Sequence, residues 1–190
     1  MRIPDLPFDV PPYRLSGVVY GTLLNHREAM AALGDAASQP PYKGPPKAPV
    51  LYVKPRNTLV ATQAAVVVPA DAPQLEVGAT LGIVIGRTAC RVGEAGALDH
   101  VAGYTIVNDV SVPHASYYRP QVRCKARDGF CPIGPRGVAR ASVANPDDLV
   151  IRVHVDGELV QQASTAGMAR PVARLIADVT EFMTLAPGDV

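Results

Sequence analysis

Two groups of polar residues in this 190-residue chain have types and spacing that suit chemistry on an anionic substrate. The first is Asn108-Asp109, which follows an apolar run and so places a carboxylate at the end of an expected strand. Such a carboxylate can serve as a general base, or it can bind a hard cation such as Mg²⁺ or Mn²⁺ through oxygen. The alternative is that Asp109 begins a turn or caps a helix.

The second group is a basic loop bounded by glycine and proline, which runs from Tyr117 to Pro132. Its arginines can hold a carboxylate at two points and its lysine supplies a compact charge. Tyr118, Arg119 and Lys125 are therefore candidate substrate-binding residues. A solvated basic surface loop is the competing interpretation.

Histidines supply a third set of candidates, because imidazole titrates near neutral pH. His26, which precedes an expected short helix, is a candidate acid/base catalyst, and His114, which follows Asp109 closely, is a similar one. A helix cap or an ordinary surface histidine is the alternative for both.

Composition and motifs exclude several classes of protein. With 18 Lys+Arg against 17 Asp+Glu, the net charge is only +1. The sequence therefore lacks the excess of positive charge that binding to nucleic acids or membrane surfaces requires. The sequence has no dinucleotide-binding or phosphate-binding glycine motif, no zinc-protease motif and no serine nucleophile elbow. Three cysteines without a paired spacing, and an N-terminus with no apolar leader, predict a cytoplasmic protein.

Apolar patterning predicts the strands that must position these residues. Strands are expected over Val50–Lys54, Ala64–Val68, Leu81–Gly86 and Tyr104–Asp109. Leu81–Gly86 is continuously apolar, as in a strand buried on both faces. A hairpin is expected from residues 149–155 and 158–160, because Asp156-Gly157 favours a type I′ turn.

Helices are fewer and mostly short. We expect helical turns over Arg27–Leu33 and over residues 94–101. Apolar residues at three- and four-residue spacing from Val172 to Met183 predict a helix of about four turns.

The domain organisation predicted is an extended N-terminal arm, residues 1–19, followed by one domain, residues 20–190. Pro187–Val190 has the pattern of a turn that enters a further strand, so we expect the domain to be cut short at its C-terminus.

Taken together, several segments resemble the fumarylacetoacetate hydrolase family. They are Tyr52–Asn57, Ile83–Gly86, Val101–Ser111 and Lys125–Pro135. Further segments are similar to the N-terminal half, or separate N-terminal subunit, of the family's isomerase/decarboxylases of 4-hydroxyphenylacetate degradation: Leu24–Arg27, Pro41–Lys43, Lys54–Thr58, Gly78–Thr80 and Tyr117–Pro120.

The resemblance implies a mixed, β-rich α+β fold, a β-roll with a few short helices, that forms homodimers or pairs with a partner subunit of the same fold. It also implies Mg²⁺ or Mn²⁺ held by a Glu-x-Glu pair and the Asp of the Asn-Asp motif. Here Gly78 and Thr80 replace the glutamates and Asp109 alone remains, so we expect weak or absent metal binding. The family's lid His and Glu fall on Ala29 and Ala32.

The resemblance also assigns substrate binding to Lys125, and charge complementarity adds Lys54 and Arg119 as a grip for a dicarboxylate. The function it implies is isomerisation or decarboxylation of an acyclic unsaturated di- or tricarboxylate, with His26 or Asp109 moving the proton. Two alternatives stay open. One is a catalytically silent half that assembles with a metal-binding partner, and the weaker one is hydrolysis of a C–C bond in an acylpyruvate.

Overall fold

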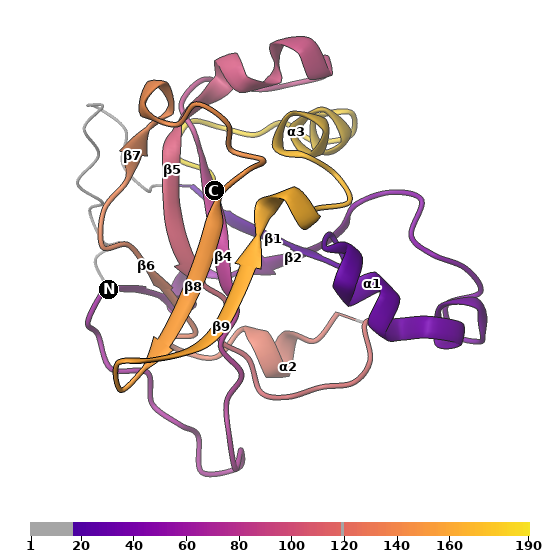
Figure 1. The fold of residues 1–190 in the computed structure, drawn as a ribbon, viewed down its shortest axis with the longest axis vertical. Helices are drawn as coiled ribbons and strands as arrows, with labels where there is room; N and C mark the ends of the chain where they lie inside the picture. Colours follow the sequence, from indigo (N-terminus) through magenta and orange to yellow (C-terminus); the bar gives the residue numbers. More distant parts are fainter. Residues whose placement is uncertain (1–16, 119) are drawn as a thin grey trace.

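The computed structural model describes residues 17–118 and 120–190, and their strands form three sheets (Figure 1). The largest sheet has the strand order β3-β6-β5-β4, with β7 paired to β5. Its strands are β3 (Leu59–Ala61), β4 (Ala79–Ile85), β5 (Val101–Asn108), β6 (Cys131–Ile133) and β7 (Val138–Ala139). The predicted β-rich α+β fold with a few short helices is confirmed.

The pairing of β4 with β5 determines where the polar residues Asn108 and Asp109 lie in the sheet. The two strands are antiparallel, with Ala79 opposite Asn108 and Ile83 opposite Tyr104. The apolar run of β5 therefore ends beside the start of β4, and Asp109 donates its backbone N–H to the carbonyl of Gly78 (2.9 Å). The sequence correctly placed Asn108 and Asp109 at a strand end.

A second sheet consists of β1 (Val19–Leu23) and β2 (Val50–Lys54), which are antiparallel, with Val19 opposite Lys54. Residues 188–190 lie between this sheet and β4, because they hydrogen-bond both to residues 17–20 and to Ile85. Gly17 and Val18, which the sequence assigned to an arm, take part in these bonds, whereas residues 1–16 lie outside the described part of the chain.

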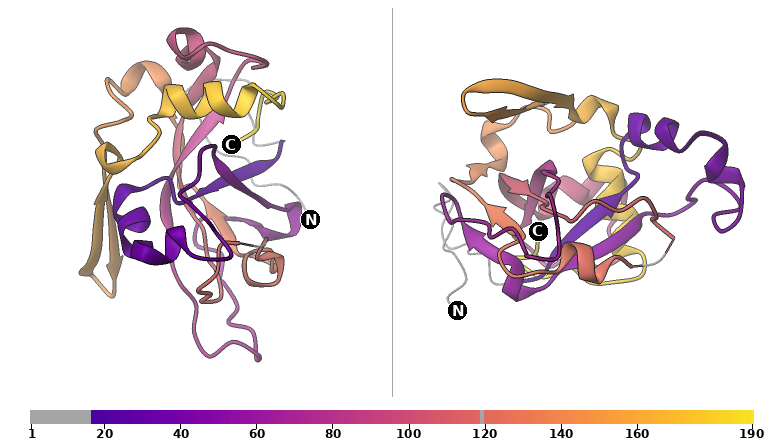
Figure 2. Two further views of the ribbon diagram at one scale, coloured as in Figure 1. Left: turned by 90° about the vertical axis from the view of Figure 1, so that its right-hand side faces the viewer. Right: turned by 90° about the horizontal axis from the view of Figure 1, so that it is seen from below.

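The third sheet is the predicted hairpin, formed by β8 (Val150–Val155) and β9 (Glu158–Ser164). Asp156 and Gly157 both have positive φ, 52° and 87°, as the predicted type I′ turn requires. Figure 2 shows this hairpin along the outside of the molecule.

The helices are α1 (Arg27–Leu33), α2 (Val122–Lys125) and α3 (Val172–Thr180), and a 3₁₀ helix covers Glu94–His100. The prediction of a longer helix up to Met183 was wrong. The regular helix ends at Thr180, and Phe182 beyond it is 66% exposed. Met183 still packs against the cluster of Ile85 and Leu185, so the apolar spacing continues past the last regular turn.

The predicted strand over Ala64–Val68 was also wrong. These residues form no strand, and Val67 and Val68 are 74% and 55% exposed. Three consecutive valines favour extended backbone, but a strand also needs a partner edge and a buried face. Neither is present beside this segment among the described residues.

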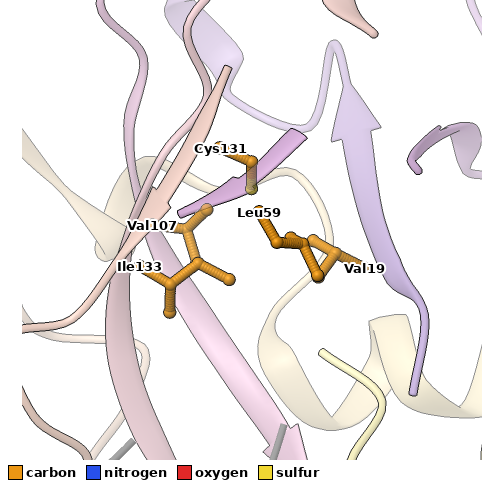
Figure 3. Packing of buried hydrophobic residues seen from close by; sticks show 5 residues of the cluster. All are labelled: Val19, Leu59, Val107, Cys131 and Ile133. Carbon is orange, nitrogen blue, oxygen red and sulfur yellow. The ribbon is translucent and has the colours of Figure 1, made fainter. Parts of the chain in front are cut away.

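The core is divided among three apolar clusters. One joins β1 to the large sheet through Val19, Leu59, Val107, Cys131 and Ile133 (Figure 3). The second packs Val172 and Ile176 of α3 against Tyr104 and the 3₁₀ helix, and the third packs Val179 against Ile85 and Leu185. Among the described residues, no helix combines the length and apolar character needed to cross a membrane.

Candidate active site around Asp109

Three elements bring charged and polar side chains together at the end of β5. Asp109 follows β5, Tyr52 and Lys54 lie two residues apart on β2, and Lys125 is the last residue of α2. Residues two apart on a strand point to the same face, so Tyr52 and Lys54 both reach toward Asp109. The chain thus assembles one carboxylate, one phenol and two ammonium groups.

Asp109 is the centre of this cluster. Its Oδ2 accepts hydrogen bonds from the Tyr52 hydroxyl and from Lys125 Nζ, each at 2.6 Å. Lys54 Nζ lies 2.6 Å from the other oxygen, Oδ1. Lys125 Nζ also stands 4.6 Å from the centre of the Tyr52 ring, where the ring face attracts a cation.

Lys54 is almost completely buried, with 1% of its side chain exposed. Its Nζ donates to the carbonyls of Val110 (2.9 Å), Lys125 (2.8 Å) and Phe130 (3.0 Å). An ammonium group has three N–H donors, so these carbonyls take all of them. The contact with Oδ1 is therefore a charge contact without a hydrogen bond, and Oδ1 is buried without a donor.

This arrangement does not favour the direct grip on substrate that charge complementarity predicted for Lys54. Its donors face protein carbonyls, and its side chain has almost no surface to offer a ligand. Lys54 instead holds the segments after β5, α2 and the start of β6 around Asp109. Lys125 has 8% of its side chain exposed and Asp109 has 14%.

The protonation states follow from burial and from these neighbours. Burial alone would raise the pKa of Asp109, but the Lys54 charge and the hydrogen bonds from Lys125 and Tyr52 outweigh it and lower that pKa. Burial, together with the nearby Asp109 charge, raises the pKa of Tyr52 above its usual value. At neutral pH Asp109 is therefore ionised and the Tyr52 hydroxyl keeps its proton.

Cys131 lies near the cluster but does not suit nucleophilic chemistry. It is fully buried, and burial raises the pKa of its thiol to about 12, helped by the Asp109 charge. The thiolate, which is the reactive form, is therefore scarce at neutral pH.

The residues present do not fit a divalent metal ion. Within residues 17–118 and 120–190, no group of three or more His, Cys, Asp or Glu side chains is placed to hold one. Asp109 already faces two ammonium groups, which would repel a cation. Gly78 offers no ligand, and a Cβ there would come within 2.8 Å of the Asp109 carbonyl oxygen.

We expect a titration with Mn²⁺ to show no saturable binding below about 1 mM, the weakest range of dedicated protein sites for divalent cations. Isothermal titration calorimetry and the electron paramagnetic resonance signal of free Mn²⁺ measure the affinity. Asp148→Asn is the control, because it removes an exposed carboxylate elsewhere. Stoichiometric binding at ~100 µM or tighter that disappears in Asp109→Asn but not in Asp148→Asn would contradict this assignment, since ~100 µM is the tight end of the weakest class of dedicated sites.

The other predicted site residues lie apart from this cluster or outside the described residues. His26 precedes α1, and its Nε2 lies 3.2 Å from the carbonyl of Ser164 on β9. No described contact joins it to Asp109. Tyr118 is 55% exposed and packs edge-on against Tyr42, and Arg119 lies outside the described residues. Of the predicted set, the structure brings together Asp109, Lys125 and Lys54.

Sequence reasoning missed Tyr52. The signal that points to it is the alternation of side chains on Val50–Lys54, which places Tyr52 on the same face as Lys54. Once Lys54 is suspected of facing the site, Tyr52 must face it too.

Salt bridges hold α2, and with it Lys125, in place from the outside. Asp71 pairs with Arg123 of α2 (3.0 Å) and with Arg127 just after it. Asn57, which follows β2, donates to the carbonyl of Ala126 (3.1 Å) and to Asp128 (2.7 Å). The loop that carries Lys125 is thus tied to two separate segments.

Comparisons with known proteins find similar sequences and similar structures. A family model described as fumarylacetoacetate (FAA) hydrolase C-terminal matches residues 18–190. The chain is 39% identical over 175 residues to the 4-hydroxyphenylacetate degradation bifunctional isomerase/decarboxylase of Escherichia coli, which covers 92% of this chain and 40% of that protein. The chain therefore spans less than half the length of this relative.

Solved structures show the same fold. The crystal structure of 2-hydroxyhepta-2,4-diene-1,7-dioate isomerase from Mycobacterium marinum matches with a TM-score of 0.72 at 32% identity, over 92% of this chain and 62% of that one. Fumarylpyruvate hydrolase from Pseudomonas aeruginosa, in complex with Mn²⁺ and pyruvate, matches with a TM-score of 0.79 at 22% identity, over 100% of this chain and 84% of that one. The second match concerns the fold alone.

Proposed function

Since the chain belongs to the fumarylacetoacetate hydrolase family, we propose that it forms part of an isomerase/decarboxylase of 4-hydroxyphenylacetate catabolism. The substrates proposed are 5-oxopent-3-ene-1,2,5-tricarboxylate, which loses CO₂, and 2-hydroxyhepta-2,4-diene-1,7-dioate, which is isomerised. In this enzyme the chain is the half that holds no metal, and it works with a partner of the same fold that does.

Similarity supports the substrate class. The relative from Escherichia coli is named for isomerase and decarboxylase activities in 4-hydroxyphenylacetate degradation, and the Mycobacterium marinum structure is that of a dienedioate isomerase. The second name describes a reaction on an acyclic unsaturated dicarboxylate. Each match spans most of this chain but only part of the matched protein, which fits a component of a larger assembly.

The charge of the Asp109 cluster is the observation that carries the proposal. Two ammonium groups beside one carboxylate leave one positive charge in a nearly buried position. Isomerisation of a dienol and decarboxylation of a β-keto acid both build negative charge on an enolate oxygen, which a preorganised positive charge stabilises. We assign Lys125 to bind the substrate anion, and Asp109 and Tyr52 to orient its ammonium group.

The side chains around Asp109 do not suit a metal ion, which supports the proposal that the partner subunit, and not this chain, binds the metal. The glutamates that the family resemblance predicts fall on Gly78 and Thr80, and both oxygens of Asp109 face lysine ammonium groups. A metal in the partner would supply a Lewis acid for the decarboxylation. C–C bond hydrolysis of an acylpyruvate by this chain alone is the less favoured reaction, since it resembles the family chemistry that depends on the metal.

A second candidate function is favoured by the same positive charge. Isomerisation needs only proton transfer and anion stabilisation, so the chain alone can be a metal-independent isomerase, with Lys125 stabilising the dienolate. His26, predicted to move the proton, would then have to approach the cluster from its position beside Ser164.

A spectroscopic assay separates the two. The absorbance of 2-hydroxyhepta-2,4-diene-1,7-dioate is followed with the chain alone, with Mg²⁺, with chelator, and with a metal-bearing subunit of the family. We expect turnover to require the partner and to be chelator-sensitive. Turnover by the chain alone that survives chelator would replace the first function by the second.

The control is the partner subunit assayed alone at the same concentration. If the partner alone is as active as the mixture, this chain contributes nothing to the reaction and the proposal fails.

A further inference from the structure

Gly21 of β1 is a glycine whose place in the chain its own backbone does not explain. It lies in the middle of a regular strand and is not one of the glycines with positive φ. Glycine weakens the interior of a strand, and where it occurs there it often marks the close approach of another group. The group that lies over Gly21 therefore explains it better than its backbone does.

The group that lies over Gly21 is the ring of Tyr52. The two residues are directly opposite each other in the antiparallel pair of β1 and β2 (Figure 1), so their side-chain positions share one face of the sheet. A Cβ on residue 21 would overlap the Cε1, Cζ and Oη atoms of Tyr52. The tip of the ring thus occupies the place where any other residue would have its side chain.

The place of the ring over Gly21 determines two contacts of the candidate active site. From there the Tyr52 hydroxyl reaches Asp109 Oδ2 (2.6 Å), and the centre of the ring lies 4.6 Å from Lys125 Nζ. Lys125 Nζ donates to the same Oδ2 at 2.6 Å. The ammonium group is therefore held by both the carboxylate and the ring, and displacing the ring removes one of these two supports.

We propose that Gly21 is a positioning residue for Lys125, because it leaves the space in which the Tyr52 ring lies across β1. In this role Gly21 touches no substrate and acts only through the ring. The inference rests on the proposed function in one respect, namely that Lys125 binds the substrate anion. A Cβ on residue 21 would meet the far end of a side chain and not backbone, so alanine there can be accommodated by turning Tyr52 away from Asp109.

A purely structural role for the pair is the competing explanation. An aromatic ring laid across a glycine covers strand backbone, and this can stabilise a sheet without any effect on Lys125. The two roles differ in what Gly21→Ala changes. A structural role predicts a change in stability alone, whereas a positioning role predicts a change in the environment and the anion affinity of Lys125.

The test is a double-mutant cycle of Gly21→Ala and Tyr52→Leu. Leucine lacks the Cε1, Cζ and Oη atoms, so nothing there overlaps a Cβ on residue 21. The NMR shifts of the Lys125 Hε protons report the nearby ring, and isothermal titration calorimetry with heptanedioate, a saturated dicarboxylate, reports the anion affinity. We expect Gly21→Ala to move the Lys125 signals and to weaken heptanedioate binding roughly three- to tenfold, the size of effect expected for a lost cation–π contact.

In the Tyr52→Leu background, Gly21→Ala should change neither readout, because the ring through which Gly21 acts is already gone. Gly96→Ala is the matched control, since a Cβ on residue 96 would have open space around it. It should leave the Lys125 signals and the affinity unchanged. Tyr52→Phe retains Cε1 and Cζ, so Gly21→Ala should still move the Lys125 signals in that background.

Equal effects of Gly21→Ala with and without the Tyr52 ring would overturn the proposal, because Gly21 would then act by another route. A lower melting temperature with no change at Lys125 would overturn it too, since that is the result of a purely structural role. If Gly21→Ala does not fold, Tyr52→Leu alone supplies the test with Gly21 intact. It should weaken heptanedioate binding by the same factor, and an unchanged affinity would refute the role of the ring.

The two readouts separate this proposal from the proposed function. If Lys125→Met leaves heptanedioate binding unchanged, the assignment of Lys125 as the anion-binding residue fails. The NMR signals of Lys125 need no ligand, so their response to Gly21→Ala still decides whether Gly21 positions Lys125.

Discussion

Replacing Lys54 by methionine is expected to lower the free energy of unfolding by about 3–5 kcal/mol, the usual cost of removing one partner from a buried charge network. The methylene stem is nearly preserved, so the loss is electrostatic. The carbonyls of Val110 and Lys125 would lose their donor, whereas that of Phe130 keeps the N–H of Val110 (3.2 Å), and each buried acceptor without a partner costs about 1–3 kcal/mol. Urea unfolding followed by circular dichroism measures the effect.

Lys47→Met is the matched control for this experiment. It makes the same chemical change at an exposed lysine, where substitutions usually alter stability by less than about 0.5 kcal/mol. If Lys54→Met costs no more than Lys47→Met, the three carbonyl contacts do not hold the site together.

Replacing Lys125 by methionine should separate binding from folding. Asp109 keeps Lys54 and Tyr52, so the fold should survive. A hydrogen bond to a charged ligand contributes roughly 1.5–3 kcal/mol, so we expect binding of heptanedioate, a saturated dicarboxylate, to weaken roughly 10–100-fold. Isothermal titration calorimetry measures the affinity, and thermal unfolding checks that the structure is intact.

Arg123→Met provides the comparison for Lys125→Met. Arg123 lies two positions earlier in α2, but its side chain is 84% exposed and pairs with Asp71 away from the cluster. The Arg123→Met substitution removes one positive charge from α2, as Lys125→Met does. Equal loss of affinity in both variants would mean that the overall charge of the loop, and not the ammonium group of Lys125, attracts the dicarboxylate.

The strands that position the site could be predicted because their sequences are continuous apolar runs or strong turn signals. β2, β4, β5 and the β8–β9 hairpin follow this pattern, and the Asn108-Asp109 pair marks the end of β5. Ala64–Val68 has equally strong β-forming residues and still forms no strand, because strand formation also depends on a partner that local sequence does not specify.

The candidate site was harder to predict than the sheet. Asp109 and Lys125 are polar residues in suggestive places, and the structure joins them. The environment of Lys54 could not be predicted, because its carbonyl partners belong to residues distant in the sequence and every residue has a carbonyl. A basic residue at the end of an apolar strand gives no sign of whether it faces a ligand or the protein's own backbone.

Lys54 also has a consequence for the order in which the protein folds. Its three carbonyl partners lie 56, 71 and 76 positions away along the chain. Contacts between such distant residues form slowly, because the intervening loops must close before the contacts stabilise anything. We therefore expect the Asp109 cluster to assemble late, after the local hairpins and helices. A folding chain would then form its secondary structure before it brings the two lysines and Asp109 together.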